Sequence, residues 1–234
     1  MIKCCAFSDM HGILRDDYVD KEVDYLFIAG DLVPLNIQSY SKESRRWFEG
    51  TFISWCLKQP VTTKIIIVAG NHDWYCERHQ EETKAIFSQY PKIVYLMNEG
   101  FEDDNIKVWG TPMCKAFGNW AFMKYVDNLE NIFCNVPDDF FTGSGKKTIL
   151  LSHDAPYGIS DIVLQKSCPW ADGSHIGNKA LLHLIQRTKP ELNLHGHLHT
   201  TNHDAEYEGT TEVRCVSLLD EDYKVAYKPY YFEL

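Results

Sequence analysis

Residues 65–73 decide the fold, and they read Ile65-Ile66-Ile67-Val68-Ala69-Gly70-Asn71-His72-Asp73. A short run of β-branched apolar residues predicts a strand buried on both faces, as in a parallel sheet with layers on each side. The run stops at Gly70, and three polar side chains follow that can hold a metal ion or carry a proton. The stretch therefore predicts chemistry at the end of a buried strand.

The same pattern of an apolar strand followed by polar residues occurs at four other places. The apolar runs are Lys3–Phe7, Tyr25–Ala29, Thr148–Leu151 and Leu192–Leu194, and the polar stretches after them are Ser8-Asp9-Met10-His11, Gly30-Asp31, Ser152-His153-Asp154 and His195-Gly196-His197-Leu198-His199. Because the carboxyl ends of parallel strands meet at one edge of a sheet, we expect these polar side chains to converge there. Strands that alternate with helical segments predict an α/β protein.

Helices are predicted between these strands. Trp47, Phe48, Phe52 and Trp55 recur at roughly helical spacing within residues 38–58, and we interpret them as core residues of a helix that ends before Pro60. Further helices are expected over Glu77–Tyr90 and Asn178–Arg187, and further strands over Ile93–Met97, Lys107–Trp109, Glu212–Leu218 and Tyr223–Phe232. The aromatic-rich segment Thr111–Phe141 has little periodicity and is either a packed irregular loop or a lid over the site.

Length, composition and charge limit the classes of protein to which the chain can belong. At 234 residues with 44% hydrophobic content it can bury one large core, so we expect a single domain over residues 1–234. A net charge of −10 argues against binding to long nucleic acid or to an anionic membrane. The apolar start breaks at Ser8-Asp9 and no apolar run is long enough to cross a bilayer, so neither a signal peptide nor a membrane span is predicted.

The eight cysteines are scattered, with no CxxC pair: they are Cys4, Cys5, Cys56, Cys76, Cys114, Cys134, Cys168 and Cys215. Disulfide frameworks belong to short secreted chains, so we predict reduced and mostly buried thiols. A reducing cytosol fits this pattern, and the expected location is cytoplasmic.

Seven residues at the strand ends offer nitrogen and oxygen donors without a thiolate: Asp9, His11, Asp31, Asn71, His153, His197 and His199. Individually each is weak evidence, since a carboxylate such as Asp31 is as readily a helix cap or a turn residue. Together the set suits two divalent ions of the borderline class, with Mn favoured and Fe, Zn, Co or Ni as alternatives.

The other histidines have plainer interpretations. We expect His79 and His183 on helix surfaces and His203 in a solvated loop. His195 is interpreted as a polar core residue, with support of the neighbouring ligand pair as the alternative.

The polar blocks occur in the order and spacing of the five-block signature of the calcineurin-like metallophosphoesterases, which the chain resembles from Ile2 to about Phe232. Four further stretches resemble the compact branch called metallophosphoesterase-domain-containing proteins: Gly110-Thr111-Pro112, Asn119-Trp120-Ala121-Phe122, Ser152-His153-Asp154-Ala155-Pro156-Tyr157-Gly158 and His175-Ile176-Gly177-Asn178. The fourth block departs from the family pattern, with Ser152 before its histidine and Asp154-Ala155-Pro156 after it, so the departure falls at the rim of the expected substrate site. The last block keeps His197, which some members lose, so two full metal sites are implied.

The resemblance implies a four-layer αββα sandwich of two mixed sheets, with the metals at the carboxyl ends of the strands. It implies one metal held by Asp9, His11, Asp31 and His199, and a second held by Asp31, Asn71, His153 and His197. Asp31 would bridge two ions roughly 3.5–4 Å apart, and water shared by such ions is acidic enough to attack phosphorus as hydroxide. His72 would act as general acid on the leaving oxygen, and Asp73 would orient it.

The implied activity is hydrolysis of a small phosphoester. We expect a phosphodiester, with cyclic or dinucleotide types favoured, because a phosphomonoester dianion calls for an arginine clamp and the motif loops offer only Arg78 nearby. Four rings would stack on a base if they reach the mouth of the site, and would otherwise be packing residues: Trp74, Tyr75, Trp120 and Phe122. The alternatives are a phosphomonoesterase, a protein Ser/Thr phosphatase, and a metal-binding scaffold without catalysis, against which His72 argues because a scaffold needs no general acid.

Overall fold

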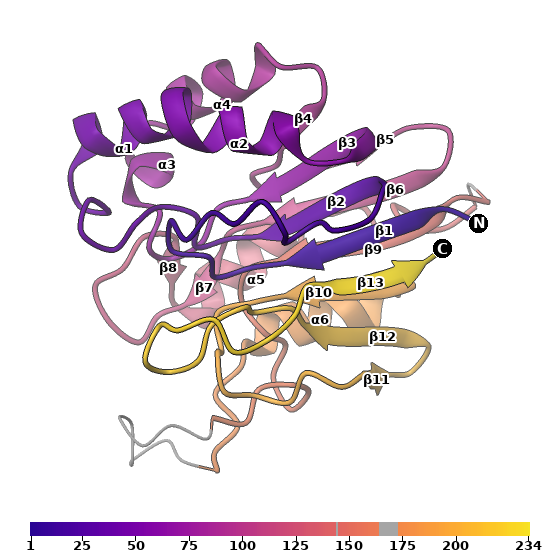
Figure 1. The fold of residues 1–234 in the computed structure, drawn as a ribbon. Coiled ribbons are helices and arrows are strands. Elements are labelled where there is room, and N and C mark those ends of the chain that lie inside the picture. Colours follow the sequence, from indigo (N-terminus) through magenta and orange to yellow (C-terminus); the bar gives the residue numbers. More distant parts are fainter. Residues whose placement is uncertain (144, 164–172) are drawn as a thin grey trace.

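Two large β-sheets form the centre of the protein in the computed structural model, which describes residues 1–143, 145–163 and 173–234 (Figure 1). The first sheet contains β1 (Lys3–Phe7), β2 (Val23–Ala29), β3 (Val61–Val68), β4 (Ile93–Tyr95) and β13 (Tyr230–Glu233), in the order β13-β1-β2-β3-β4. The second contains β5 (Glu99–Glu102), β6 (Ile106–Thr111), β9 (Lys147–Ser152), β10 (Leu192–His195), β11 (Glu206–Glu208) and β12 (Thr211–Cys215), in the order β11-β12-β10-β9-β6-β5.

Both sheets are mixed. Strands β1 to β4 run parallel and β13 pairs antiparallel with β1. In the second sheet β12, β10, β9 and β6 run parallel, and the edge strands β11 and β5 are antiparallel. The parallel strands therefore deliver their carboxyl ends to one side of the molecule, as the sequence pattern predicts.

Side-chain alternation explains how the two sheets pack. Ile66 and Val68 of β3 point into a buried cluster between the sheets, where they meet Val108 of β6 and Ile149 of β9. Their neighbours Ile65 and Ile67 belong instead to the cluster on the outer face. A strand with period-2 alternation and no polar face is one that is covered on both sides, which is why residues 65–68 read as a continuous apolar run.

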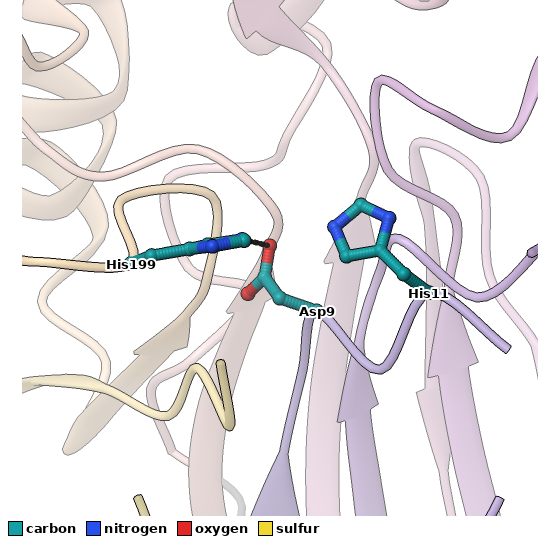
Figure 2. A group of neighbouring side chains, drawn as sticks. All are labelled: Asp9, His11 and His199. Carbon is teal, nitrogen blue, oxygen red and sulfur yellow. Dashed lines mark ion pairs between the residues drawn. The ribbon is translucent and has the colours of Figure 1, made fainter. Parts of the chain in front are cut away.

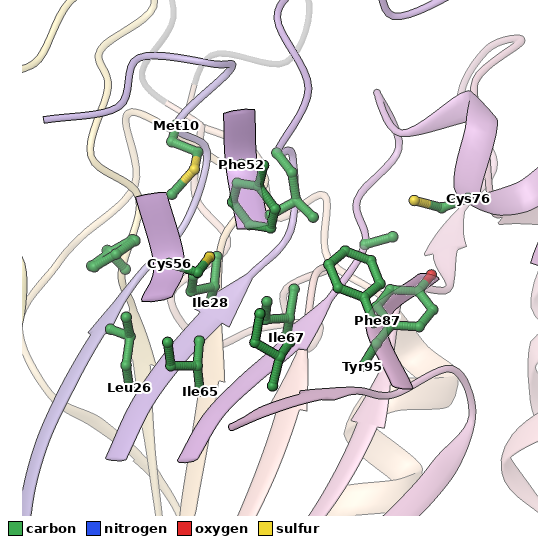
Figure 3. Close-up of a cluster of buried hydrophobic side chains, with 14 of the residues drawn as sticks. Met10, Leu26, Ile28, Phe52, Cys56, Ile65, Ile67, Cys76, Phe87 and Tyr95 are labelled. Atoms are coloured by element: carbon green, nitrogen blue, oxygen red, sulfur yellow. The ribbon is translucent and has the colours of Figure 1, made fainter. Parts of the chain in front are cut away.

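Helices cover the outer faces of both sheets. The helical segments over the first sheet are α1 (Ser41–Trp47), the π-helical segment η1 (Phe48–Phe52), α2 (Ile53–Lys58), α3 (Trp74–Arg78) and α4 (Gln80–Ser88), and those over the second are α5 (Val126–Phe133) and α6 (Lys179–Thr188) (Figure 1). Figure 3 shows Phe52 and Cys56 lying over Ile28 and Ile65, with Phe87 of α4 beside Tyr95. The layer order is helix, sheet, sheet, helix, so the expected four-layer αββα sandwich of two mixed sheets is confirmed.

Several element boundaries differ from the predictions. The segment Thr111–Phe141 is not irregular throughout, because it contains the two-stranded pair β7 (Cys114–Lys115) and β8 (Met123–Lys124) and the helix α5, which buries Leu129 and Phe133. The predicted strand Tyr223–Phe232 is wrong over most of its length, since only its end lies in β13 and Tyr223 occupies a turn with φ of 59°. The predicted helix over Glu77–Tyr90 is interrupted at His79, which separates α3 from α4.

The cysteines of the described residues are free thiols. Six of them are buried and Cys134 is exposed, as predicted for reduced thiols, while Cys168 lies outside the described residues. Within residues 1–143, 145–163 and 173–234, no helix has the length and apolar character needed to cross a bilayer.

Candidate metal centre

Loops at the carboxyl ends of β1, β2, β3, β9 and β10 carry the predicted residues, and those after β1, β2 and β10 have an unusual backbone conformation. Asp9, His11, Asp31 and His197 all have positive φ angles, of 54°, 41°, 53° and 68°. Residues other than glycine seldom adopt this left-handed region, and such strained residues cluster at functional sites. These turns leave Asp9 and His11 with donor atoms close together, while Met10 between them is part of the hydrophobic core.

Glycines allow the loops to approach one another closely. A Cβ added at Gly70 would lie 2.6 Å from His153 Cε1 and would overlap the Asp31 carboxylate. A Cβ at Gly196 would lie 2.7 Å from Ser8 Cβ and would overlap the Asp9 carboxylate. The glycines of the Gly70-Asn71-His72-Asp73 and Gly196-His197 blocks are therefore required by the space that the carboxylates occupy.

Asp31 lies at the middle of the site, with its two oxygens facing different histidines. Its Oδ2 is 3.5 Å from His11 Nε2, and its Oδ1 is 3.4 Å from His153 Nε2. His153 Nε2 is also 2.9 Å from Asn71 Oδ1. A single buried carboxylate is thus shared between two groups of donor atoms.

Asp9 and His199 form the second pair of the site. Asp9 Oδ1 is 3.4 Å from His199 Nε2, and Figure 2 shows the carboxylate lying between His199 and His11. The other oxygen, Oδ2, accepts hydrogen bonds from the Ser8 hydroxyl and, at 2.8 Å, from the Ser217 hydroxyl. These hydroxyls fix the carboxylate so that Oδ1 faces the histidines.

Backbone carbonyls orient two of the histidine rings. The Nδ1 atom of His153 is 2.7 Å from the carbonyl oxygen of Ala29, and that of His199 is 2.9 Å from the carbonyl oxygen of Asp220. Each contact leaves Nε2 directed toward a carboxylate. In a neutral ring, a carbonyl oxygen on Nδ1 leaves the Nε2 lone pair for a cation, which is the usual arrangement around metal-binding histidines.

Burial and the two carboxylates set the charge states of the site. Burial lowers the pKa of His11 to about 4 and that of His197 to about 3. Burial also disfavours the charged form of His153, but the adjacent Asp31 carboxylate outweighs it and raises the pKa of His153 to about 10. The Asp31 pKa is held well below its usual value, because the nearby histidines outweigh the burial of the carboxylate. Near neutral pH the rings of His11 and His197 are therefore neutral donors beside ionised carboxylate.

The donors present fit divalent cations. Both ring nitrogens of His11 are buried without a hydrogen-bond partner among the described residues, although buried polar groups are normally paired. Asp9, His11 and His199 offer donor atoms within 4.8 Å of one another, and so do Asp9, Asp31 and His153. Nitrogen and oxygen donors without a thiolate match the borderline divalent metals. His197 lies beside the second group, with its ring centroid 5.2 Å from that of His153.

His72 borders the centre but is held by a residue that the sequence does not reveal. Its Nε2 is 4.0 Å from Asp31 Oδ2, and its Nδ1 is 2.5 Å from Gln38 Oε1. The prediction that Asp73 orients this ring is wrong, because the Asp73 carboxylate accepts hydrogen bonds from the backbone amides of Gly70, Leu32 and Val33. Asp73 instead fixes the loop after β2 to the loop after β3. The contact of Gln38 with His72 follows from the three-dimensional structure and has no counterpart in the sequence pattern.

The predicted substrate-contacting rings fall into two groups. Trp120 lies against His72, with ring centroids 4.5 Å apart and an interplanar angle of 32°. Tyr75 and Phe122 are only 2% and 0% exposed and belong to the hydrophobic core, so the prediction that they contact substrate is wrong. An aromatic residue in these loops can pack in the hydrophobic core or line the mouth of the site. The sequence alone does not distinguish these two roles.

The remaining predicted contact residues pair with each other. The Arg78 guanidinium lies 4.5 Å from the ring centroid of Trp74. Two rings at the site have no counterpart among the predictions: Phe117 lies on His197, and Tyr223 contacts His11 and His199.

Of the other histidines, His183 is exposed as expected, whereas His203 is partly buried and stacks on Tyr227 instead of lying in a solvated loop. His195 is fully buried beneath the ligand loop, as expected for a polar core residue.

Comparison with known proteins identifies the family to which this arrangement corresponds. A family model described as calcineurin-like phosphoesterase matches residues 3–201, which include every predicted metal ligand. No curated protein matches the chain by sequence.

Solved structures share the fold at low sequence identity. The protein TT1561 of Thermus thermophilus superposes with a TM-score of 0.62 at 16% identity, covering 92% of this chain and 88% of that one. A dimetal phosphatase from Danio rerio superposes with a TM-score of 0.54 at 11% identity, covering 92% of this chain and 86% of that one. At these identities the similarity establishes the fold.

Proposed function

The chain belongs to the calcineurin-like phosphoesterase family and is a metal-dependent phosphoesterase, and from that premise we propose that it hydrolyses a small phosphodiester with His72 as the general acid. The observation that carries this proposal is the placement of His72. One ring nitrogen is held by Gln38 and the other faces the carboxylate shared by the two donor groups. A ring in this position borders the shared carboxylate while remaining outside the proposed ligand set, which supports a role in proton transfer.

The proposed ligand sets are those that the family implies, and the observed donor groups support them in part, since Asp9, His11 and His199 lie together and Asp31 lies with His153. One cation would be held by Asp9, His11, Asp31 and His199, and the other by Asp31, Asn71, His153 and His197. The opposed oxygens of Asp31 support its place in both sets. When bound, the two cations supply Lewis acidity that makes water nucleophilic near neutral pH and neutralises charge on the phosphoryl oxygens. Manganese is the favoured metal, with iron, zinc, cobalt or nickel as alternatives.

The chain's own residues then perform three tasks. His72 donates a proton from Nε2 to the leaving oxygen, a contribution that is typically worth about 10²–10⁴-fold in rate. Gln38 accepts the hydrogen bond from Nδ1–H and so orients the ring, which leaves the Nε2 proton of the acid form directed at the centre. Trp120 lies against the imidazole ring, with centroids 4.5 Å apart, and limits its movement.

The cationic side chains near the site already contact other groups of the protein, and this supports a diester substrate over a monoester substrate. Arg78 lies over Trp74, Lys115 donates to the carbonyl oxygen of Ile176, and Lys124 pairs with Glu77. A phosphomonoester carries a second negative charge that an arginine clamp would normally bind. In the part of the chain that the structure describes, these neighbouring cations already have partners, which favours a monoanionic diester.

A phosphomonoesterase, including a protein Ser/Thr phosphatase, is the second candidate, and the fold shared with the dimetal phosphatase from Danio rerio favours it. The two are separated by kcat/KM of the Mn-loaded protein for bis(p-nitrophenyl) phosphate and 2′,3′- or 3′,5′-cyclic nucleotides against p-nitrophenyl phosphate and a phosphopeptide. We expect the diesters to be preferred, and preference for the monoesters would overturn the proposal.

Membership of the compact branch and a cytoplasmic location are further proposals, the second supported by the free thiols of the described residues.

A further inference from the structure

Three aromatic rings border the metal centre, and each touches a different part of it. The ring centroid of Trp120 lies 4.5 Å from that of His72. The centroid of Phe117 lies 5.5 Å from that of His197, at an interplanar angle of 37°. The ring of Tyr223 meets His11 edge to face, with centroids 4.9 Å apart. Rings therefore lie beside both proposed ligand sets and beside the proposed acid.

Phe117 differs from the other two rings in its exposure. Its side chain is 62% exposed although it contacts a partly buried histidine of the centre. It lies just after β7, where the Ala116 amide donates to the carbonyl oxygen of Lys124 and anchors the base of the loop. A large apolar ring at the edge of a polar site presents a free face to whatever occupies that site.

Tyr223 is held rigidly by a turn that also supports the centre. Its backbone has a φ of 59°, and its amide donates to the carbonyl oxygen of Asp220 at 3.0 Å. The Asp220 side chain accepts the amides of Asp222 and Lys224, which closes the turn. The same Asp220 carbonyl oxygen contacts Nδ1 of His199, so the ring position is coupled to a proposed ligand.

We propose that Phe117 and Tyr223 determine substrate specificity by binding a planar aromatic substituent, a nucleobase, on the phosphodiester that the proposed function assigns to this centre. Phe117 stacks on the base through its exposed face, and Tyr223 borders the same site beside His11 and His199. The proposal rests on the proposed function and adds the class of substituent. Because the nearby cationic side chains are engaged by other groups, we assign discrimination between diesters to these rings. Stacking of a base on an aromatic side chain is strong and accepts different bases.

The test compares two substrates that differ only in the base. These are adenosine 2′,3′-cyclic phosphate and the 2,3-cyclic phosphate of 1-O-methylribose, followed by phosphorus NMR with the Mn-loaded protein. Phe117→Ala is expected to raise KM for the nucleotide about 10-fold more than KM for the base-free diester, with little change in kcat. Phe117→Tyr keeps a ring and should restore the wild-type ratio, while Tyr207→Ala, which removes an exposed ring on the edge strand β11, should leave that ratio unchanged.

Failure of the inference is distinguishable from failure of the proposed function. If wild-type protein hydrolyses both diesters and Phe117→Ala raises both KM values equally, the inference is wrong and the phosphodiesterase assignment stands. If wild-type protein hydrolyses neither, the proposed function is wrong. The inference is then decided by calorimetric Kd values for adenosine 2′-monophosphate and for 1-O-methylribose 2-phosphate. It requires that Phe117→Ala bind the nucleotide more weakly than wild type does, and it fails if the Kd of the nucleotide is unchanged.

Discussion

Replacing Gln38 with leucine tests the proposed role of His72 without touching a proposed metal ligand. The substitution keeps a side chain of similar size and removes the acceptor that lies 2.5 Å from His72 Nδ1. An unpaired polar group that is buried costs about 1–3 kcal/mol, and His72 is only 8% exposed. If that cost falls on the transition state, at about 1.4 kcal/mol for each factor of ten, the expected loss is about 5- to 140-fold in kcat. The contact of Trp120 with the ring limits larger displacement and favours the lower part of that range.

The assay compares leaving groups. A diester with an alkoxide leaving group needs proton donation, whereas a nitrophenolate leaves readily without it, so Gln38→Leu should slow the alkyl diester much more than the nitrophenyl diester. Gln38→Glu retains an acceptor oxygen for Nδ1 and serves as the matched control, with a smaller loss expected. Metal content should equal that of wild type in both variants. An equal loss on both diesters, or loss of bound metal, would refute the positioning role.

Three further predictions concern the acid, the loop geometry and the metals. His72→Ala should keep both metals and lose about 10²–10⁴-fold in kcat on an alkyl diester, measured with the metal-loaded variant; loss of metal would point to a ligand role instead. Gly70→Ala should lower the free energy of unfolding by about 1–3 kcal/mol and weaken metal binding, because its Cβ would overlap the Asp31 carboxylate. Denaturant titration measures the first effect, and Gly50→Ala, whose Cβ meets no atom within 4 Å, should not destabilise. Chelation should abolish hydrolysis and added Mn²⁺ should restore it; activity that survives complete removal of metal contradicts a metal-dependent reaction.

The strand-end blocks are the part of the fold that sequence predicts best. Residues 65–68 alternate between the two faces of β3, and both faces are apolar because a sheet and a helical layer cover them. Polar residues directly after such strands converge because parallel strands share an end. By contrast, the edge strand β5 has exposed residues along much of its length, so its pattern carries no comparable signal.

Residues that reach the site from outside the blocks escaped prediction. Gln38 is 34 residues from His72 in the chain and lies among residues that read as the start of a helix. Tyr223 reads as part of an alternating strand, whereas the turn closed by Asp220 places its ring edge to face with His11. Asp73 shows the opposite error, since adjacency to His72 predicts a contact with the ring but its carboxylate is taken up by backbone amides. Such contacts depend on long-range packing and leave no local periodicity.

The sharing of Asp31 between two cations is tested most directly by counting metals. Elemental analysis of wild-type protein and Asp31→Asn, each loaded with Mn²⁺ and desalted, gives metal ions per chain, and circular dichroism checks that the fold is retained. We expect about two ions per wild-type chain, fewer than two in the variant, and a loss of several orders of magnitude in diester hydrolysis, because both oxygens of this carboxylate face donor groups. Two ions per chain and near-native activity in Asp31→Asn would contradict the shared role of Asp31.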